Sequence, residues 1–211
     1  MRTATDTVRW KDAPTHTVDV GGVDFAYREL GATSGVPVVF LHHFTAVLDD
    51  WDPRLIDGIA AHHRVIVFDN RGVGASGGTV PPTVEEMGRD AIAFIRALGL
   101  ERVDLFGFSL GGGVAQMVAL QAPELVRRMI LAGTGPRGGD GIDEITQPVL
   151  VANGDHDLMV ASSHSADMAR RLPDARLTIY PDSGHGGVFQ HHEKFVPAAL
   201  AFLNGSGETP R

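Results

Sequence analysis

Short apolar runs recur along this chain, and each is the right length for one buried strand. They lie at residues 36–41 (VPVVFL), 65–68, 103–106, 129–132, 149–151 and 177–180. A mostly apolar run without polar alternation is typical of a strand covered on both faces. Segments with helical spacing separate most of these runs. Alternation of strand and helix indicates a parallel sheet with helices on both faces.

The first two extended runs predict a different pairing. Residues 17–20 and 24–27 are separated by Gly21-Gly22, which is typical of a hairpin. Helices are expected at residues 49–61, 84–98 and 193–203, the second opened by the capping box Thr83-x-x-Glu86. We therefore expect an α/β fold with a mostly parallel, twisted sheet of about eight strands, in which the first hairpin is antiparallel.

Length and composition limit the classes of protein to consider. The chain has 211 residues, 43% of them hydrophobic, which suits one core domain spanning residues 1–211. The net charge of −8 disfavours nucleic acid and anionic membranes as partners. The absence of cysteine, of a long apolar stretch and of a secretory signal predicts a cytoplasmic protein. Residues 204–211 are expected to form a flexible tail.

One serine stands between two glycines at a strand-to-helix junction. The motif GFSLG, residues 107–111, follows an apolar run and precedes a run of small and apolar residues typical of a buried helix. A sharp turn of this kind exposes the serine hydroxyl, and glycines remove the Cβ atoms that would collide within it. The start of the helix also directs N–H groups at the site. We interpret Ser109 as a nucleophile.

A serine nucleophile needs a base, and the base needs an orienting acid. Asp155 and Asp157 follow the strand at residues 149–151, and His185 follows the strand at residues 177–180. In an open parallel sheet, the carboxyl ends of the strands meet at one edge, where active sites lie. The order Ser, Asp, His is therefore compatible with one catalytic site, with either aspartate as its acid.

Four motifs in this order resemble the α/β-hydrolase superfamily: FDNRGVGAS (68–76), GFSLGGGVAQ (107–116), GDHD (154–157) and DSGHGGVFQ (182–190). Esterases, enol-lactonases and cofactor-free perhydrolases of that superfamily are the most similar. The resemblance implies Ser109 as the nucleophile, His185 as the base and Asp157 as the acid, with Asp155 as a turn residue.

The resemblance also implies an oxyanion hole formed by two backbone N–H groups. One belongs to Leu110, and the other to Phe44 in the loop after the strand at 36–41. Relatives usually carry His-Gly before the second donor, whereas this chain has His42-His43. A substrate pocket is expected to include side chains from several loops: His43, Trp51, Met159 and Val188.

Relatives carry a mostly helical cap after the sixth strand, but here only the turn-like residues 136–147 lie between two strands. We expect an uncapped core with an open pocket. Without a cap, we expect an exposed apolar patch formed by Phe44, Leu110, Met159 and Val188, a surface for self-association as a homo-oligomer.

The expected function is hydrolysis of a small carboxylic ester or lactone through an acyl-enzyme, without a cofactor. No metal is expected, since the histidine pairs, such as 62–63 and 191–192, do not match the spacing of metal ligands. Two alternatives stay open. The same site could perform perhydrolysis, or the chain could be a nearly inactive scaffold that binds a ligand.

Overall fold

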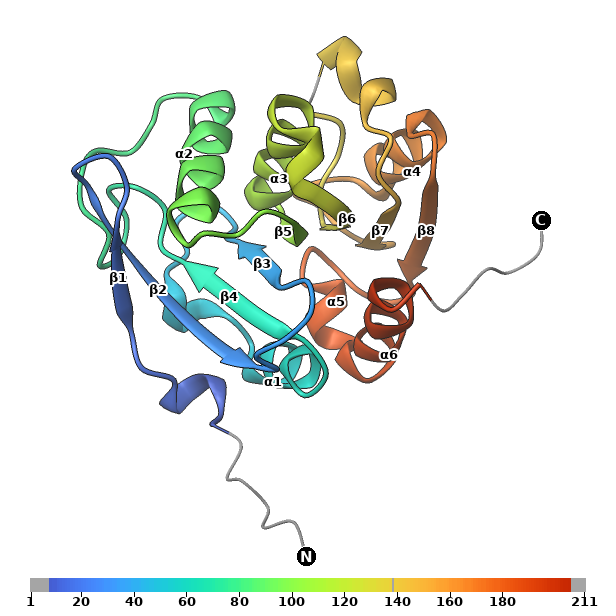
Figure 1. Ribbon diagram of the computed structural model, residues 1–211. Helices are drawn as coiled ribbons and strands as arrows, with labels where there is room; N and C mark the ends of the chain where they lie inside the picture. The colour runs from blue at the N-terminus through green and yellow to red at the C-terminus, as the bar shows by residue number, and fades with distance from the viewer. Residues whose placement is uncertain (1–7, 138, 206–211) are drawn as a thin grey trace, which may run out of the picture.

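The computed structural model describes residues 8–137 and 139–205. Eight strands form one sheet in the order β1-β2-β4-β3-β5-β6-β7-β8 (Figure 1). They span His16–Asp19 (β1), Asp24–Gly31 (β2), Val38–Leu41 (β3), Arg64–Phe68 (β4), Val103–Phe108 (β5), Val126–Ala132 (β6), Val149–Gly154 (β7) and Ala175–Tyr180 (β8). β2 pairs antiparallel with β1 and β4, and the remaining pairings are parallel. The predicted sheet and its antiparallel first hairpin are confirmed.

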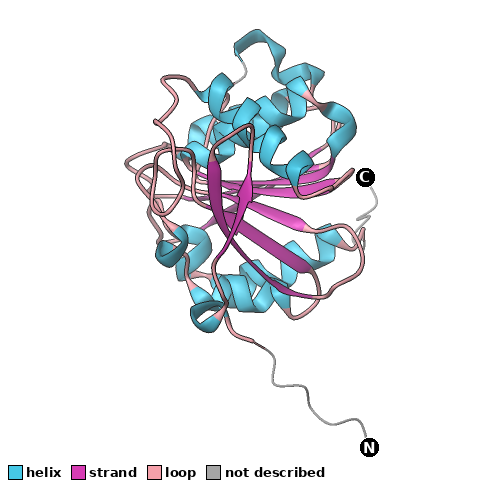
Figure 2. Ribbon diagram, turned by 60° about the vertical axis from the view of Figure 1, so that its left-hand side comes forward, coloured by secondary structure: helices cyan, strands magenta, loops and turns pink. Residues whose placement is uncertain are grey.

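Helices cover both faces of this sheet (Figure 2). The α-helices are Pro53–Ala60 (α1), Val84–Ala97 (α2), Leu110–Gln121 (α3), Ser162–Arg171 (α4), Gly187–Gln190 (α5) and His192–Leu203 (α6). Short 3₁₀ helices lie at Trp10–Asp12 (η1), Leu48–Asp50 (η2), Pro123–Leu125 (η3) and Gly139–Glu144 (η4). α2, α3 and α4 lie on one face, and α1, α5 and α6 lie on the other (Figure 1).

The central strands bury side chains on both faces, which explains why their sequences show no polar alternation. In β3, Val39 and Leu41 join the apolar cluster under α2 and α3, while Val38 and Phe40 join the cluster under α1 and α6. All four side chains are at most 1% exposed. Successive strand residues point to opposite faces, so each central strand contributes to two cores.

The boundaries of two helices follow from their caps. Thr83 accepts a hydrogen bond from the backbone N–H of Glu86 at 3.2 Å, and α2 begins directly after it, as predicted. Asp52 accepts from the backbone N–H of Arg54 at 2.9 Å, and α1 therefore begins at Pro53 rather than at the predicted residue 49. The residues before this cap form the separate helix η2.

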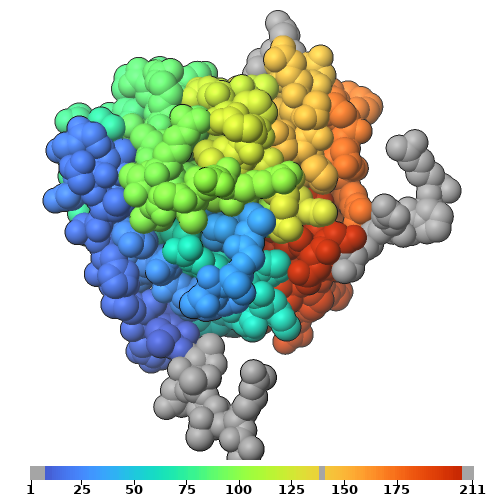
Figure 3. Space-filling view, viewed as in Figure 1, coloured from blue at the N-terminus to red at the C-terminus, as the bar shows by residue number. Residues whose placement is uncertain are grey.

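The first and last strands, β1 and β8, are the two edge strands of the sheet and therefore lie on opposite sides of the molecule. In the space-filling view, the blue N-terminal part lies on one flank, and the orange and red part that follows β7 lies on the opposite flank (Figure 3). Between β6 and β7, the described residues include η4 within the segment 136–147. Of the expected tail, residues 206–211 lie outside the described residues. No helix in the described ranges has the length and apolarity to span a bilayer.

Candidate active site

Ser109 occupies the sharp turn between β5 and α3. Its φ is 55° and its ψ is −114°, a conformation that side-chain-bearing residues rarely adopt. Such a backbone costs on the order of 1–3 kcal/mol and persists only where neighbouring structure holds it. The backbone N–H of Ser109 donates to the carbonyl of Ala132 in β6 at 2.9 Å. The turn is therefore held by the adjacent strand, and the serine side chain is half-buried rather than packed in the core.

The two glycines of the motif are required by close backbone contacts. A Cβ at Gly107 would lie 2.4 Å from the carbonyl oxygen of Gly111. A Cβ at Gly111 would lie 2.0 Å from the carbonyl oxygen of Leu41, at the end of β3. Neither distance is possible for a real side chain. The first turn of α3 therefore contacts the backbone at the end of β3, where the loop expected to supply the second oxyanion donor begins.

Half-buried His185 and buried Asp157 form a hydrogen-bonded pair. The Nδ1 of His185 lies 2.7 Å from Oδ2 of Asp157, whose side chain is fully buried. The other carboxylate oxygen, Oδ1, accepts from the backbone N–H groups of Met159 at 2.8 Å and Val160 at 2.9 Å. A carboxylate accepts hydrogen bonds, so Nδ1 of the imidazole donates, and in the neutral ring the lone pair is on Nε2. This is the tautomer that a general base requires.

Asp155 has a different environment. Its exposed carboxylate lies 2.6 Å from the Nδ1 of His156 and accepts from the backbone N–H of Ser183 at 3.2 Å. This bond ties the loop after β7 to the loop after β8. The structure therefore places Asp157, and not Asp155, beside His185.

The ring of His185 lies next to the nucleophile turn. Its centroid is 5.0 Å from that of Phe108, the residue directly before Ser109. A Cβ at Gly133 would lie 3.2 Å from Cε1 of His185, so glycine at that position leaves room for the imidazole. The Nε2 of His185 is buried and has no hydrogen-bond partner among the described residues. It is the free polar atom of the pair and is available for a proton.

The segment expected to supply the second oxyanion donor is a tight loop. Thr45 has a φ of 65°, and its hydroxyl donates to the carbonyl of Phe44 at 2.6 Å. The Nδ1 of His43 lies 2.9 Å from the same carbonyl. These contacts fix the orientation of one peptide group in the loop. Leu110 is the first residue of α3, so its N–H has no acceptor within the helix.

A buried polar network supports this loop from below. Trp51 donates through Nε1 to Nδ1 of His42 at 2.8 Å, and Nε2 of His42 lies 3.8 Å from Oδ1 of Asp69. Asp69 in turn accepts from the backbone N–H groups of Leu48 at 2.8 Å and Ala75 at 2.9 Å. Burial lowers the pKa of His42 to about 4 and raises the pKa of Asp69. The network joins the loop after β3 to the loop after β4.

The four side chains expected at the pocket separate into two pairs. His43 is half-buried, with its ring 5.6 Å from that of Phe108, and Met159 is 75% exposed. Trp51 and Val188 are 3% and 1% exposed, so neither lines an open pocket. Trp51 is held in the core by its bond to His42 and by edge-on packing against Phe40 at 5.1 Å between ring centroids.

The expected apolar patch needs the same correction. Phe44 is 72% exposed and Leu110 is half-buried, but the burial of Val188 removes it from the patch. Leu158, for which no role was expected, directly follows Asp157 and is 99% exposed. Phe108, which was not among the expected site residues, packs against both His43 and His185. Its position next to the nucleophile was the available signal.

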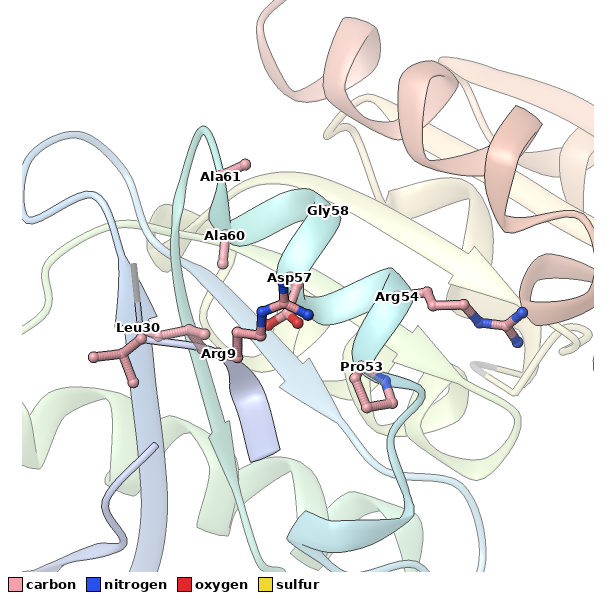
Figure 4. Close-up of a pocket in the computed structure, with 9 residues that line it drawn as sticks. Arg9, Leu30, Pro53, Arg54, Asp57, Gly58, Ala60 and Ala61 are labelled. Carbon is pink, nitrogen blue, oxygen red and sulfur yellow. The ribbon is translucent and has the colours of Figure 1, made fainter. Parts of the chain in front are cut away.

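A cavity of about 680 Å³ lies along α1, away from these loops (Figure 4). Arg54, Asp57 and Gly58 come from α1, and Leu30 comes from β2. Leu30 pairs with Val65 near the start of β4, which places the cavity at the amino end of the parallel strands. The described residues that line it include no member of the Ser109, Asp157 and His185 set. Within the described ranges, His, Asp and Glu side chains do not gather in a group of three or more that could hold a metal ion.

A nucleophile turn after β5, with acid and base on loops after β7 and β8, is the arrangement of α/β-hydrolases. Residues 36–139 match the family model described as the alpha/beta hydrolase fold. A solved structure, an alpha/beta hydrolase fold protein from Chitinophaga pinensis, is 31% identical with a TM-score of 0.89, covering 93% of this chain and 99% of that one. The chain belongs to the alpha/beta hydrolase fold family.

Curated relatives of the chain have more than one named activity. A protein of Azorhizobium caulinodans, provisionally named carbamate hydrolase RutD, is 32% identical over 64% of this chain and 51% of its own length. A non-heme chloroperoxidase of Streptomyces lividans is 35% identical over 54% of this chain and 42% of its own length. The chain thus spans about half the length of these relatives.

Proposed function

We propose that this protein is a serine hydrolase that cleaves carboxylic esters or lactones through an acyl-enzyme at Ser109. The observation that carries the proposal is the 2.7 Å contact between His185 and Asp157, which leaves Nε2 of His185 without a hydrogen-bond partner among the described residues. The ring of His185 lies 5.0 Å from that of Phe108, the residue directly before the strained Ser109. Family membership supports a hydrolase.

The proposed reaction needs no group beyond the substrate and water. The Oγ of Ser109 attacks the acyl carbon while His185 takes the hydroxyl proton on Nε2. The tetrahedral oxyanion is held by the N–H groups of Leu110 and Phe44. The C–O bond to the leaving group then breaks, and the alkoxide takes the proton from Nε2. Water, activated by the same nitrogen, attacks the acyl-enzyme and releases the acid and Ser109.

The test is hydrolysis of 4-nitrophenyl acetate, run beside labelling with a fluorophosphonate probe that reacts with activated serines. Ser109→Ala should abolish both signals. Ser34→Ala, which changes an exposed serine in the turn before β3, should leave both unchanged. If Ser109→Ala retained most of the rate, or if the wild-type protein resisted the probe, the proposal would be wrong. The second result would favour the inactive scaffold.

Perhydrolysis is a second candidate, favoured by the match to the chloroperoxidase. In this reaction hydrogen peroxide, in place of water, attacks the acyl-enzyme and releases a peracid and free Ser109. The acyl group passes from Oγ of Ser109 to the peroxide oxygen. Peracid formation from acetate and hydrogen peroxide, measured in wild type and in Ser109→Ala, distinguishes this activity from ester hydrolysis.

A further inference from the structure

A small cavity of about 240 Å³ lies on the catalytic edge of the sheet, between the loop after β6 and the loop after β7. The proposed reaction does not use it. One wall comes from the loop after β6, and the other comes from the loop after β7 and the first turn of α4. The lining residues are Gly135, Pro136, Arg137, Met159, Val160 and His164.

One wall is hydrogen-bonded to the proposed acid, and the other is hydrogen-bonded to α3. On one side, the backbone N–H groups of Met159 and Val160 donate to Oδ1 of Asp157. On the other side, the backbone N–H of Arg137 donates at 2.9 Å to Oε1 of Gln116, a fully buried residue of α3. The cavity is therefore fixed relative to Asp157 and to α3, the helix that begins directly after Ser109.

The amide nitrogen of Gln116 completes this support. It donates to the carbonyl of Gly112, in the first turn of α3, at 3.1 Å and to the carbonyl of Gly135 at 3.0 Å. Gly113 lies against the same arginine, because a Cβ there would come within 2.9 Å of Cγ of Arg137. A glutamine with three hydrogen bonds thus positions the stem of Arg137 against the nucleophile helix.

The side chains around this cavity favour an anion. Arg137 and His164 supply a guanidinium and an imidazole, and no Asp or Glu is among the described residues that line it. Neither side chain has an ion pair or hydrogen bond with the rest of the described chain. By contrast, Arg64 pairs with Glu29 at 2.5 Å and Arg71 with Asp90 at 2.6 Å. A guanidinium fork matches a carboxylate in a bidentate geometry.

We infer that Arg137 and His164 form a subsite for a carboxylate carried by the substrate, so that the preferred substrates are short anionic esters. This inference rests on the proposed function, because it assigns the substrate class of the same site. The cavity volume of about 240 Å³ suits a short aliphatic group that ends in a carboxylate. That carboxylate belongs to either the acyl group or the leaving group, and the test has one arm for each.

The acyl arm compares the monoester 4-nitrophenyl glutarate with neutral 4-nitrophenyl pentanoate. The leaving-group arm compares 4-acetoxybenzoate with its methyl ester. In one of the two comparisons, the kcat/KM of wild type should be at least about tenfold higher for the anionic ester than for the neutral one. Tenfold corresponds to the weakest hydrogen bonds that charged groups usually form. Arg137→Gln should bring that ratio close to one, and Arg137→Lys should retain part of it. Arg176→Gln, an exposed arginine of β8, is the matched control and should keep the wild-type ratio.

A binding measurement separates this inference from the proposed function. Glutarate should shift the NMR signal of the His164 ring in Ser109→Ala, and Arg137→Gln should abolish the shift. If no ester is hydrolysed but glutarate binds in this way, the subsite stands and the proposed function is wrong. If neutral and anionic esters are hydrolysed equally and glutarate does not bind, the inference is overturned. An equal fall of both rates in Arg137→Gln also overturns it.

Discussion

Trp51 donates through its indole N–H to Nδ1 of His42 at 2.8 Å, inside the core and directly beneath the loop that follows β3. Because the indole nitrogen can only donate, Nδ1 of His42 must accept, and its proton resides on Nε2. The buried pair therefore fixes both a tautomer and the position of the backbone that precedes His43. Two predictions concern this pair.

Trp51→Phe should lower the free energy of unfolding by about 1–3 kcal/mol, because it leaves the buried Nδ1 of His42 without a partner. Urea denaturation measures the effect. Trp10→Phe is the matched control, since Trp10 is equally buried and its indole has no hydrogen bond among the described residues. A similar loss in both variants would show that packing, and not the hydrogen bond, accounts for the change.

The stability of the protein should depend on pH through His42. Burial lowers its pKa from 6.5 to about 4, so the folded state favours the neutral ring. A group whose pKa is lower in the folded than in the unfolded chain contributes stability that is complete above its unfolded pKa and is lost as the pH falls through the window. Here that window runs from about pH 6.5 down to about pH 4.

From pH 7 to pH 5, wild type should therefore lose about 2 kcal/mol more than His42→Gln. Asp69 acts in the opposite direction, since burial raises its pKa, but it is present in both proteins. Urea denaturation at the two pH values gives the difference. Equal losses in both proteins would mean that His42 is not the responsible group.

Asp157→Asn should reduce turnover about 10⁴-fold, because an amide in place of the carboxylate favours the wrong tautomer of His185. Asp155→Asn is the matched substitution two residues away. It should cost far less activity, since Asp155 pairs with His156 and Ser183. Ester kinetics on both variants, with folding checked by circular dichroism, test the ranking. A reversed ranking would move the acid to Asp155.

Gly111→Ala should destabilise the fold by about 3 kcal/mol or more, because its Cβ would collide with backbone rather than with a movable side chain. The nearest atom is the carbonyl oxygen of Leu41, at 2.0 Å. Gly77→Ala is the control, since a Cβ there would make ordinary contacts at 3.6 Å. Thermal unfolding of both variants is the measurement. If the two melted alike, the close approach of α3 to β3 would be wrong.

Much of the fold could be predicted because the local signals agree with one another. Uniformly apolar runs marked the strands that are buried on both faces, and the capping box at Thr83 marked the start of α2. Local sequence signals did not predict the ends of elements that are set by tertiary contacts. β2 continues to Gly31 because its second half, from Tyr27 onward, pairs with β4, a long-range contact that no local pattern encodes.

Part of the candidate site could also be predicted. The turn around Ser109 has a local signature, but residue types alone do not distinguish Asp155 from Asp157. That distinction depends on which carboxylate the loop after β7 directs towards His185. The burial of Trp51 and Val188 depends on packing between distant elements. The role of Gln116 in holding the loop after β6 likewise has no signal in its neighbours, since Gly135 and Arg137 lie beyond the next strand.

The position of His185 after β8, the edge strand, has a consequence for the order of folding. The strained turn at Ser109 lies at the centre of the sheet, among strands that come earlier in the chain. During vectorial synthesis, the elements up to β6 emerge before the loops that carry Asp157 and His185. The sequence of the turn at Ser109 is therefore complete while the proposed base is still absent. A chain that ends before β8 would carry Ser109 without His185, and the proposed hydrolytic activity would be acquired last.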